Sequence, residues 1–155
     1  MKKINKLSAD LERTGTDALV KGYQRILLSR VTSGPNKGAF SIFAMTQGYS
    51  FSDNSQTYQY VRTLTKDTDS VWLTAYVVKC LAFLKQFIAV NDYYLREAMD
   101  FLVKKQTGTG QFAEYGPIYY YTIQSESTHG IPLTAFTVIA LSLIHIWRCR
   151  RSTLC

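Results

Sequence analysis

The chain has 155 residues, of which 46% are hydrophobic and 14% are aromatic. This composition excludes a disordered segment and predicts one globular domain with a sizeable core. The net charge is +7, but Arg148, Arg150 and Arg151 supply three of these charges, and without them it falls to +4. The basic charge therefore does not indicate a nucleic-acid-binding protein.

The cysteines and the N-terminus do not reveal a compartment. Cys80, Cys149 and Cys155 have neither the number of a disulfide framework nor the spacing of a zinc site. The first eight residues are basic, but no apolar stretch follows them, so they are not a secretory signal. Taken alone, the sequence would stay in the cytosol.

The first predicted element is an amphipathic helix over residues 10–29, with Ser8 as its N-cap. Its apolar stripe consists of Leu11, Ala18, Leu19, Gly22 and Ile26. Gly15 and Gly22 each cost about 1 kcal/mol relative to Ala, unless a neighbour packs closely there. A turn-rich segment at 32–38 ends this helix, and residues 44–66 read as a long loop.

Three more helices follow. Residues 70–89 are almost wholly apolar, and Lys79 and Gln86 leave only a narrow polar edge, which predicts a helix buried nearly all round. Residues 91–105 alternate apolar and charged positions and predict a helix with one solvent-exposed face. After a loop at 107–127, residues 132–144 predict a second, nearly all-apolar helix.

The apolar segment 131–147 carries no formal charge and is followed by arginines, as a membrane span would be. Its length of 17 residues lies at the lower limit of about 17–25 residues for a span, and Pro132, Thr134 and His145 weaken the pattern. We expect no membrane span.

One four-residue pattern occurs twice at the start of an apolar helix. Leu73-Thr74-Ala75-Tyr76 follows Gly38-Ala39-Phe40, and Leu133-Thr134-Ala135-Phe136 follows Gly110-Gln111-Phe112. Such a period indicates repeated helical hairpins. Amphipathic helices alternating with buried ones are satisfied by an outer and an inner ring, so the prediction is an all-α fold, a partial α/α toroid of the terpenoid-cyclase-like kind.

These residues carry a family resemblance. Lys21-Gly22-Tyr23-Gln24-Arg25, both Gly-x-Phe turns, and above all the stretch from Val71 to Lys79 resemble the thioester-containing domain of the alpha-2-macroglobulin and complement family. The resemblance covers about residues 8–143. It implies a large secreted parent that acts as an endopeptidase inhibitor or in innate immunity. In that family a strained Cys–Gln thioester, sheltered in an apolar pocket, is attacked by amines or hydroxyls of proteases or target surfaces.

The chain departs from the family pattern at the reactive residues. The Gly-Cys-Gly-Glu-Gln motif is absent, so the thioester Cys and Gln are expected about one helix upstream of Met1. Where the complement branch places an acyl-accepting His, this chain has Tyr120, or Tyr119 or Tyr121 if the shorter loop shifts the register. A phenol with a pKa near 10 is a poor nucleophile at neutral pH, so capture is expected to favour amines.

The C-terminus departs as well. From residue 144 to 155 the sequence resembles read-through into a cloning adaptor, so we divide the chain into a domain fragment at 1–143 and a non-native tail at 144–155. Within this interpretation Cys149, Cys155 and His145 have no function.

Other candidate sites have simpler structural interpretations. Asp67 and Asp69 precede the helix expected from Ser70, where carboxylates favour the positive helix end over a metal role. His129 and His145 lack the partners of a metal site, although His129 remains an alternative acyl acceptor. Cys80 is expected to fill core space. The glycines at 34–38 and 108–110 are expected to form turns. Four tyrosines either line a pocket or close a loop over the core: Tyr115, Tyr119, Tyr120 and Tyr121.

The preferred interpretation is a non-enzymatic fragment of an extracellular thioester-type protein that needs no cofactor or metal. One alternative is an isoprenoid-processing toroid enzyme, which would need an acidic or zinc constellation that the sequence lacks. The other alternative is a helical protein-interaction module.

Overall fold

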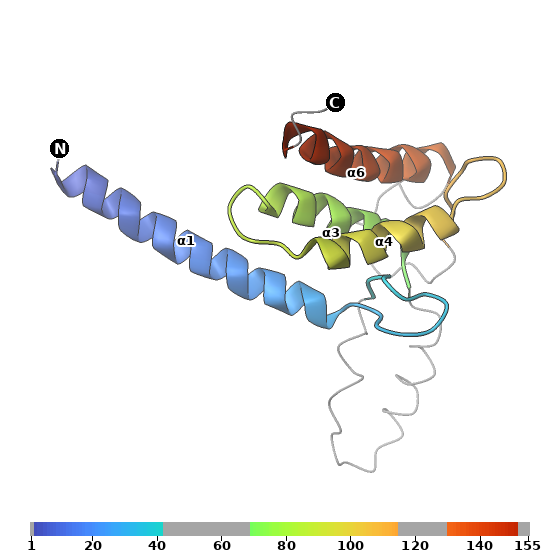
Figure 1. Cartoon of the computed structure of the whole chain (residues 1–155), viewed down its shortest axis with the longest axis horizontal. Coiled ribbons are helices and arrows are strands. Elements are labelled where there is room, and N and C mark those ends of the chain that lie inside the picture. The colour runs from blue at the N-terminus through green and yellow to red at the C-terminus, as the bar shows by residue number, and fades with distance from the viewer. Residues whose placement is uncertain (1, 42–68, 115–129, 152–155) are drawn as a thin grey trace, which may run out of the picture.

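The computed structural model describes residues 2–41, 69–114 and 130–151, with side chains for 9–41, 69–114 and 130–143. Four helices follow one another in this part of the chain: α1 (Lys2–Leu28), α3 (Val71–Leu84), α4 (Asp92–Lys104) and α6 (Gly130–Arg151) (Figure 1). Pairing between extended segments is limited in these ranges to three isolated antiparallel bridges. The predicted all-α class is confirmed.

Helix α3 is the centre of the fold, because it packs against α6 on one side and α4 on the other (Figure 1). The residues that it buries are Val71, Trp72, Thr74, Ala75, Val77, Val78, Leu81 and Ala82. Helix α4 buries one stripe, made of Leu95, Ala98, Phe101 and Leu102, and exposes the opposite one, as its pattern predicts. The two apolar helices therefore lie side by side with amphipathic helices outside them, which is the arrangement of a partial α/α toroid.

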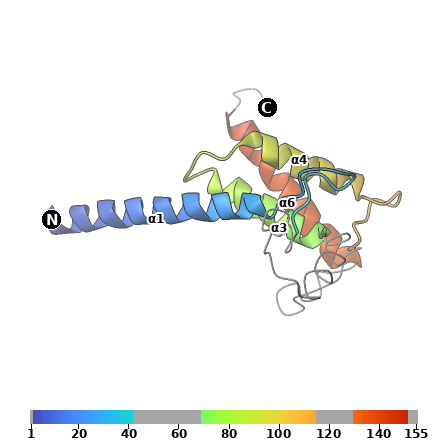
Figure 2. The ribbon, with the colours of Figure 1, turned by 90° about the horizontal axis from the view of Figure 1, so that it is seen from below.

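Helix α1 is longer than predicted. It begins at Lys2, so Ser8 lies inside the helix and the N-cap prediction is wrong; the preceding residues contain no Gly or Pro to stop the helix. Only its C-terminal part meets the core, through Tyr23 and Ile26, while its N-terminal part projects away from the other helices (Figures 1 and 2). Among the described residues, nothing beyond the neighbouring backbone of α1 itself lies within 4 Å of a Cβ at Gly15 or Gly22, so close packing with the described elements does not explain these glycines.

The apolar helices also differ from their predicted bounds. Helix α3 ends at Leu84, five residues early, because the chain turns there and brings Lys85 into an ion pair with Asp92 at the start of α4. Helix α6 begins at Gly130 and continues to Arg151, seven residues beyond the prediction. None of the helices within the described ranges combines the length and hydropathy that a bilayer span requires.

The expectation that residues 70–89 are buried nearly all round is wrong for one face. Tyr76 is 45% and Phe83 is 59% exposed on α3, and Val138 and Ile139 are 50% and 53% exposed on α6. The two helices cover each other on their shared side, but no described element covers this second side. Both helices therefore carry more apolar side chains than the described part of the fold buries.

Candidate functional site

The repeated sequence pattern corresponds to a repeated structural unit. In the first copy, the backbone N–H of Phe40 donates to Thr74 Oγ1 at 3.0 Å, and this hydroxyl donates to the carbonyl of Ser70 at 2.7 Å. In the second copy, the N–H of Phe112 donates to Thr134 Oγ1 at 3.0 Å, and that hydroxyl donates to the carbonyl of Gly130 at 2.9 Å. We call α3 and α6 the inner helices and α1 and α4 the outer helices. The Thr of each Leu-Thr-Ala therefore connects a Gly-x-Phe loop to the first turn of an inner helix.

The two loops have the same construction. Each closes with an isolated antiparallel bridge, between Arg30 and Phe40 in one case and Gln106 and Phe112 in the other. Each also needs a glycine with positive φ, +93° at Gly38 and +83° at Gly110. Gly38 has a second constraint, because a Cβ there would lie 2.2 Å from the backbone oxygen of Glu97 on α4. The first loop thus packs directly on the outer helix.

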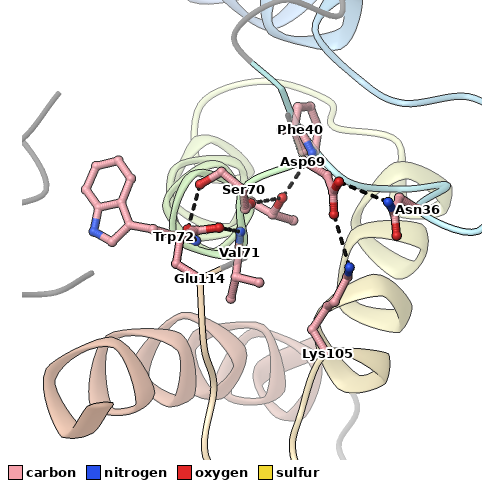
Figure 3. A network of polar contacts seen from close by, with 9 residues as sticks. Asn36, Phe40, Asp69, Ser70, Val71, Trp72, Lys105 and Glu114 are labelled. Carbon is pink, nitrogen blue, oxygen red and sulfur yellow. Dashed lines mark hydrogen bonds and ion pairs between the residues drawn. The ribbon is translucent and has the colours of Figure 1, made fainter. Parts of the chain in front are cut away.

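The N-terminus of α3 receives a carboxylate from the second loop (Figure 3). Ser70 is the N-cap, and its side chain accepts from the N–H of Leu73. Glu114 then binds the same helix end: its carboxylate accepts from Ser70 Oγ at 2.9 Å, from the N–H of Val71 at 3.0 Å and from the N–H of Trp72 at 2.9 Å. A carboxylate at this position satisfies free helix N–H groups and interacts favourably with the helix dipole. Glu114 therefore joins the second repeat to the first.

Asp69 connects the same junction to the first loop and to α4. Its carboxylate accepts from Asn36 Nδ2 at 2.9 Å and lies 3.1 Å from Lys105 Nζ (Figure 3). The predicted place of Asp69 just before the helix is confirmed, but its carboxylate contacts the side chains of Asn36 and Lys105. Its neighbour Asp67 lies outside the described residues.

A second cluster of charges holds the first loop against α4. Glu97, whose side chain is 11% exposed, pairs with both Arg30 and Lys37 and accepts from the Tyr93 hydroxyl. Burial acts to raise the pKa of Glu97, but hydrogen bonds from Lys37 and Tyr93 and the charges of Arg30 and Lys37 outweigh it, so this pKa lies below its ordinary value of 4.5. Hydrogen bonds and charge interactions with Glu97 and Tyr93 raise the pKa of Lys37. Arg30 also stacks over Tyr94, at 4.5 Å from the ring centroid.

Aromatic side chains connect the two inner helices next to the Glu114 contact. Trp72 on α3 stacks on Phe136 on α6, with ring centroids 5.7 Å apart and planes 11° apart. Trp72 also stacks on Tyr76, at 5.4 Å and 5°. Trp72 and Phe136, near the start of α3 and of α6, are therefore neighbours in space, and the predicted side-by-side arrangement of their helices is confirmed.

Cys80 lies one turn after Tyr76 and is a free thiol. It is partly exposed, whereas the sequence predicted a core-filling role. Its charge and hydrogen bond raise the pKa of the Tyr76 hydroxyl. Its contact with Tyr76 indicates a structural role for Cys80 and not a separate functional site.

Tyr115, Tyr119, Tyr120, Tyr121 and His129 lie outside the described residues, and so does the side chain of His145. Among the side chains that the structure does describe, no cluster of His, Cys, Asp and Glu has the form of a metal site.

The role of Glu114 was not predicted from the sequence. Its Oε1 binds a backbone N–H 43 residues earlier in the chain, so no local helix signal indicates this contact. The sequence contains one indication of this contact. Glu114 lies two residues after Phe112, and the Gly-x-Phe loops of this repeat contact the inner helices.

Comparison with known proteins extends these observations. The sequence profile of the A-macroglobulin TED domain matches residues 1–153. The chain is similar to complement C3 of Eptatretus burgeri, with 31% identity over 72 residues, which are 46% of this chain and 4% of that protein. It is also similar to thioester-containing protein 1, alleles S3 and S1, of Anopheles gambiae, with 29% identity over 77 residues, or 49% of this chain and 6% of each relative.

The chain thus spans a small part of the length of these relatives. The profile match, in contrast, includes both Gly-x-Phe loops and all four described helices. The chain belongs to the A-macroglobulin TED domain family.

Proposed function

We propose that this chain is part of an extracellular complement-like protein that tags its targets covalently in innate immunity or protease inhibition. The chain would supply two consecutive inner–outer helix pairs of the domain, and its parent would supply the thioester. The main support is the repeated unit in which Thr74 and Thr134 each fix a Gly-x-Phe loop to an inner helix. The names of the relatives, a complement component and a thioester-containing protein, support the same chemistry.

In this proposal the helical framework has a mechanical task. A thioester is consumed by water unless it is sheltered until a target arrives, so the loops around it must be held in place. The junction at the start of α3 is suited to this task, because it fixes the first loop through Asp69 and the second through Glu114. The chain itself contributes no catalytic group among its described residues; the reaction is acyl transfer from the parent's Gln carbonyl to a target nucleophile, with the Cys thiolate as the leaving group.

The residue at the acyl-acceptor position determines the target class. With Tyr120 in place of the complement-branch His, no imidazole takes the acyl group and passes it to hydroxyls. Primary amines of target surfaces or proteases are therefore the proposed partners.

Incorporation of methylamine into the full-length parent tests this function. The expected result is one methylamine bound per chain and one thiol released per methylamine, which a thiol reagent measures. An intact parent that binds no methylamine and releases no thiol, before or after limited proteolysis, contradicts the proposal.

Residues 144–155 remain a separate proposal, in which they are an adaptor-derived tail. Sequencing of genomic DNA over the same position is expected to give a different continuation after residue 143. Recovery of the same tail from genomic DNA would refute this part.

A further inference from the structure

Ser70 forms hydrogen bonds toward both Gly-x-Phe loops. Its backbone N–H donates to the carbonyl of Phe40 in the first loop at 3.4 Å, and its carbonyl accepts from Thr74 Oγ1, which itself accepts from the N–H of Phe40. Its hydroxyl donates at 2.9 Å to the carboxylate of Glu114, two residues after Phe112 of the second loop (Figure 3). Ser70 therefore lies between the second loop and both backbone polar groups of Phe40.

Asp69 forms a parallel connection. Its carboxylate accepts from Asn36 of the first loop at 2.9 Å and pairs at 3.1 Å with Lys105, which directly precedes the second loop (Figure 3). The side chains of Asp69 and Lys105 are only 11% and 22% exposed. Two consecutive residues, Asp69 and Ser70, thus bind the two ends of the second loop, and the same two residues bind the first loop.

The second copy of the repeat lacks this arrangement. Its position corresponding to Ser70 is Gly130, whose carbonyl accepts from Thr134 Oγ1 as the carbonyl of Ser70 accepts from Thr74 Oγ1. Gly130 has no side chain, so it cannot donate a hydroxyl to a carboxylate as Ser70 does. The connection at Ser70 is therefore a specific feature of α3 and not an automatic result of the repeat.

We propose that Asp69 and Ser70 couple the two Gly-x-Phe loops, so that the loops open and close as one unit. Both loops bind the first turn of α3, and a contiguous network of hydrogen bonds joins them through it. If the second loop opened alone, the N–H groups of Val71 and Trp72 would lose the Glu114 carboxylate, and the helix start that holds the fully buried Phe40 would loosen. This inference goes beyond the proposed function and does not require a thioester.

Hydrogen exchange at single amides of the full chain tests the coupling. Glu114→Gln should lower the protection of the Phe40 amide by at least about fivefold, together with that of Trp72, although the contacts described for Glu114 are with α3 and its N-cap. Thr137→Val, a change at a buried hydroxyl outside the network, should leave both amides unchanged. Unchanged protection of Phe40 in Glu114→Gln, or an equal fall in Thr137→Val, would overturn the inference.

The coupling must also act in the opposite direction. Thr74→Val, a change in the first repeat, should lower the protection of the Phe112 amide in the second loop. On a Glu114→Gln background this effect should become smaller, because one of the two connections is already broken. An effect of Thr74→Val that is absent in the wild-type chain, or that keeps its full size on the Glu114→Gln background, would overturn the inference.

Two substitutions at Ser70 test the same connection independently of Glu114. Ser70→Thr keeps the hydroxyl and should leave the protection of Phe40 and Phe112 close to that of the wild type, whereas Ser70→Ala should lower both. Equal effects of Ser70→Thr and Ser70→Ala would overturn the inference. Coupled loops in a protein whose parent binds no methylamine would refute the proposed function alone.

Discussion

Thr74→Val removes the contact that defines the repeated unit while preserving side-chain shape. Both Thr74 and Phe40 are fully buried, so the Phe40 N–H cannot exchange its lost acceptor for water. The Ser70 carbonyl keeps its bond from the N–H of Thr74, at 3.0 Å, so the acceptor is the important loss. An unsatisfied buried N–H costs about 1–3 kcal/mol.

Hydrogen exchange measured at single amides is the appropriate assay, because it reports the local opening of each loop. A loss of about 1–3 kcal/mol corresponds to a fall in protection of about 5- to 150-fold at the Phe40 amide. Thr134→Val should produce the same kind of effect at the Phe112 amide, but a smaller one, because Thr134 is partly exposed.

Thr137→Val is the matched control. Thr137 is also fully buried, but its hydroxyl only donates to the carbonyl of Leu133 within the same helix, at 2.9 Å. It therefore leaves no loop N–H without an acceptor. Unchanged protection at Phe40 in Thr74→Val, or an equal fall in Thr137→Val, would refute the argument that these threonines fix the loops.

Four further predictions follow from the junction and its loops. Gly38→Ala should destabilise the contact with α4 by about 2–5 kcal/mol, seen as lost exchange protection along that helix, since it adds both positive-φ strain and a clash with Glu97; normal protection would contradict this. The Glu97 carboxyl should titrate with a midpoint below pH 4.5 when followed by carbon NMR. Because folding lowers this pKa, the contribution of Glu97 to stability is complete above pH 4.5 and is lost as the pH falls through the folded-state pKa. A midpoint at or above pH 4.5 would exclude the described contacts. Glu114→Gln should reduce protection of the Trp72 amide by about 5- to 30-fold, a loss of about 1–2 kcal/mol, whereas Glu12→Gln on exposed α1 should not, and equal effects would disprove a specific contact. In the parent protein, Tyr120→His should raise incorporation of glycerol relative to methylamine, and an unchanged ratio would show that residue 120 is not at the acceptor position.

The sequence was sufficient to predict the pairing of the inner helices, because the same four-residue pattern lies near the start of both of them. It also predicted α4 closely, since Asn91 caps its first turn and a clear apolar stripe follows. These features are local, or repeat within the chain, and so they can be read without coordinates.

The features that were not predicted depend on contacts distant in sequence. Glu114 caps a helix that begins 43 residues earlier. The hydrophobic pattern predicted that the helix continues to residue 89, whereas the chain turns after Leu84, where Lys85 forms an ion pair with Asp92. The exposure of one side of α3 was not predicted for a different reason. Its apolar residues at Tyr76 and Phe83 predict burial, but none of the described helices lies against them.

The coding sequence immediately upstream of Met1 tests the central claim most directly, namely that this chain is one part of a thioester-containing toroid. The account predicts an open reading frame that encodes Gly-Cys-Gly-Glu-Gln about one helix before Met1. An untranslated region with in-frame stop codons at that position would contradict it.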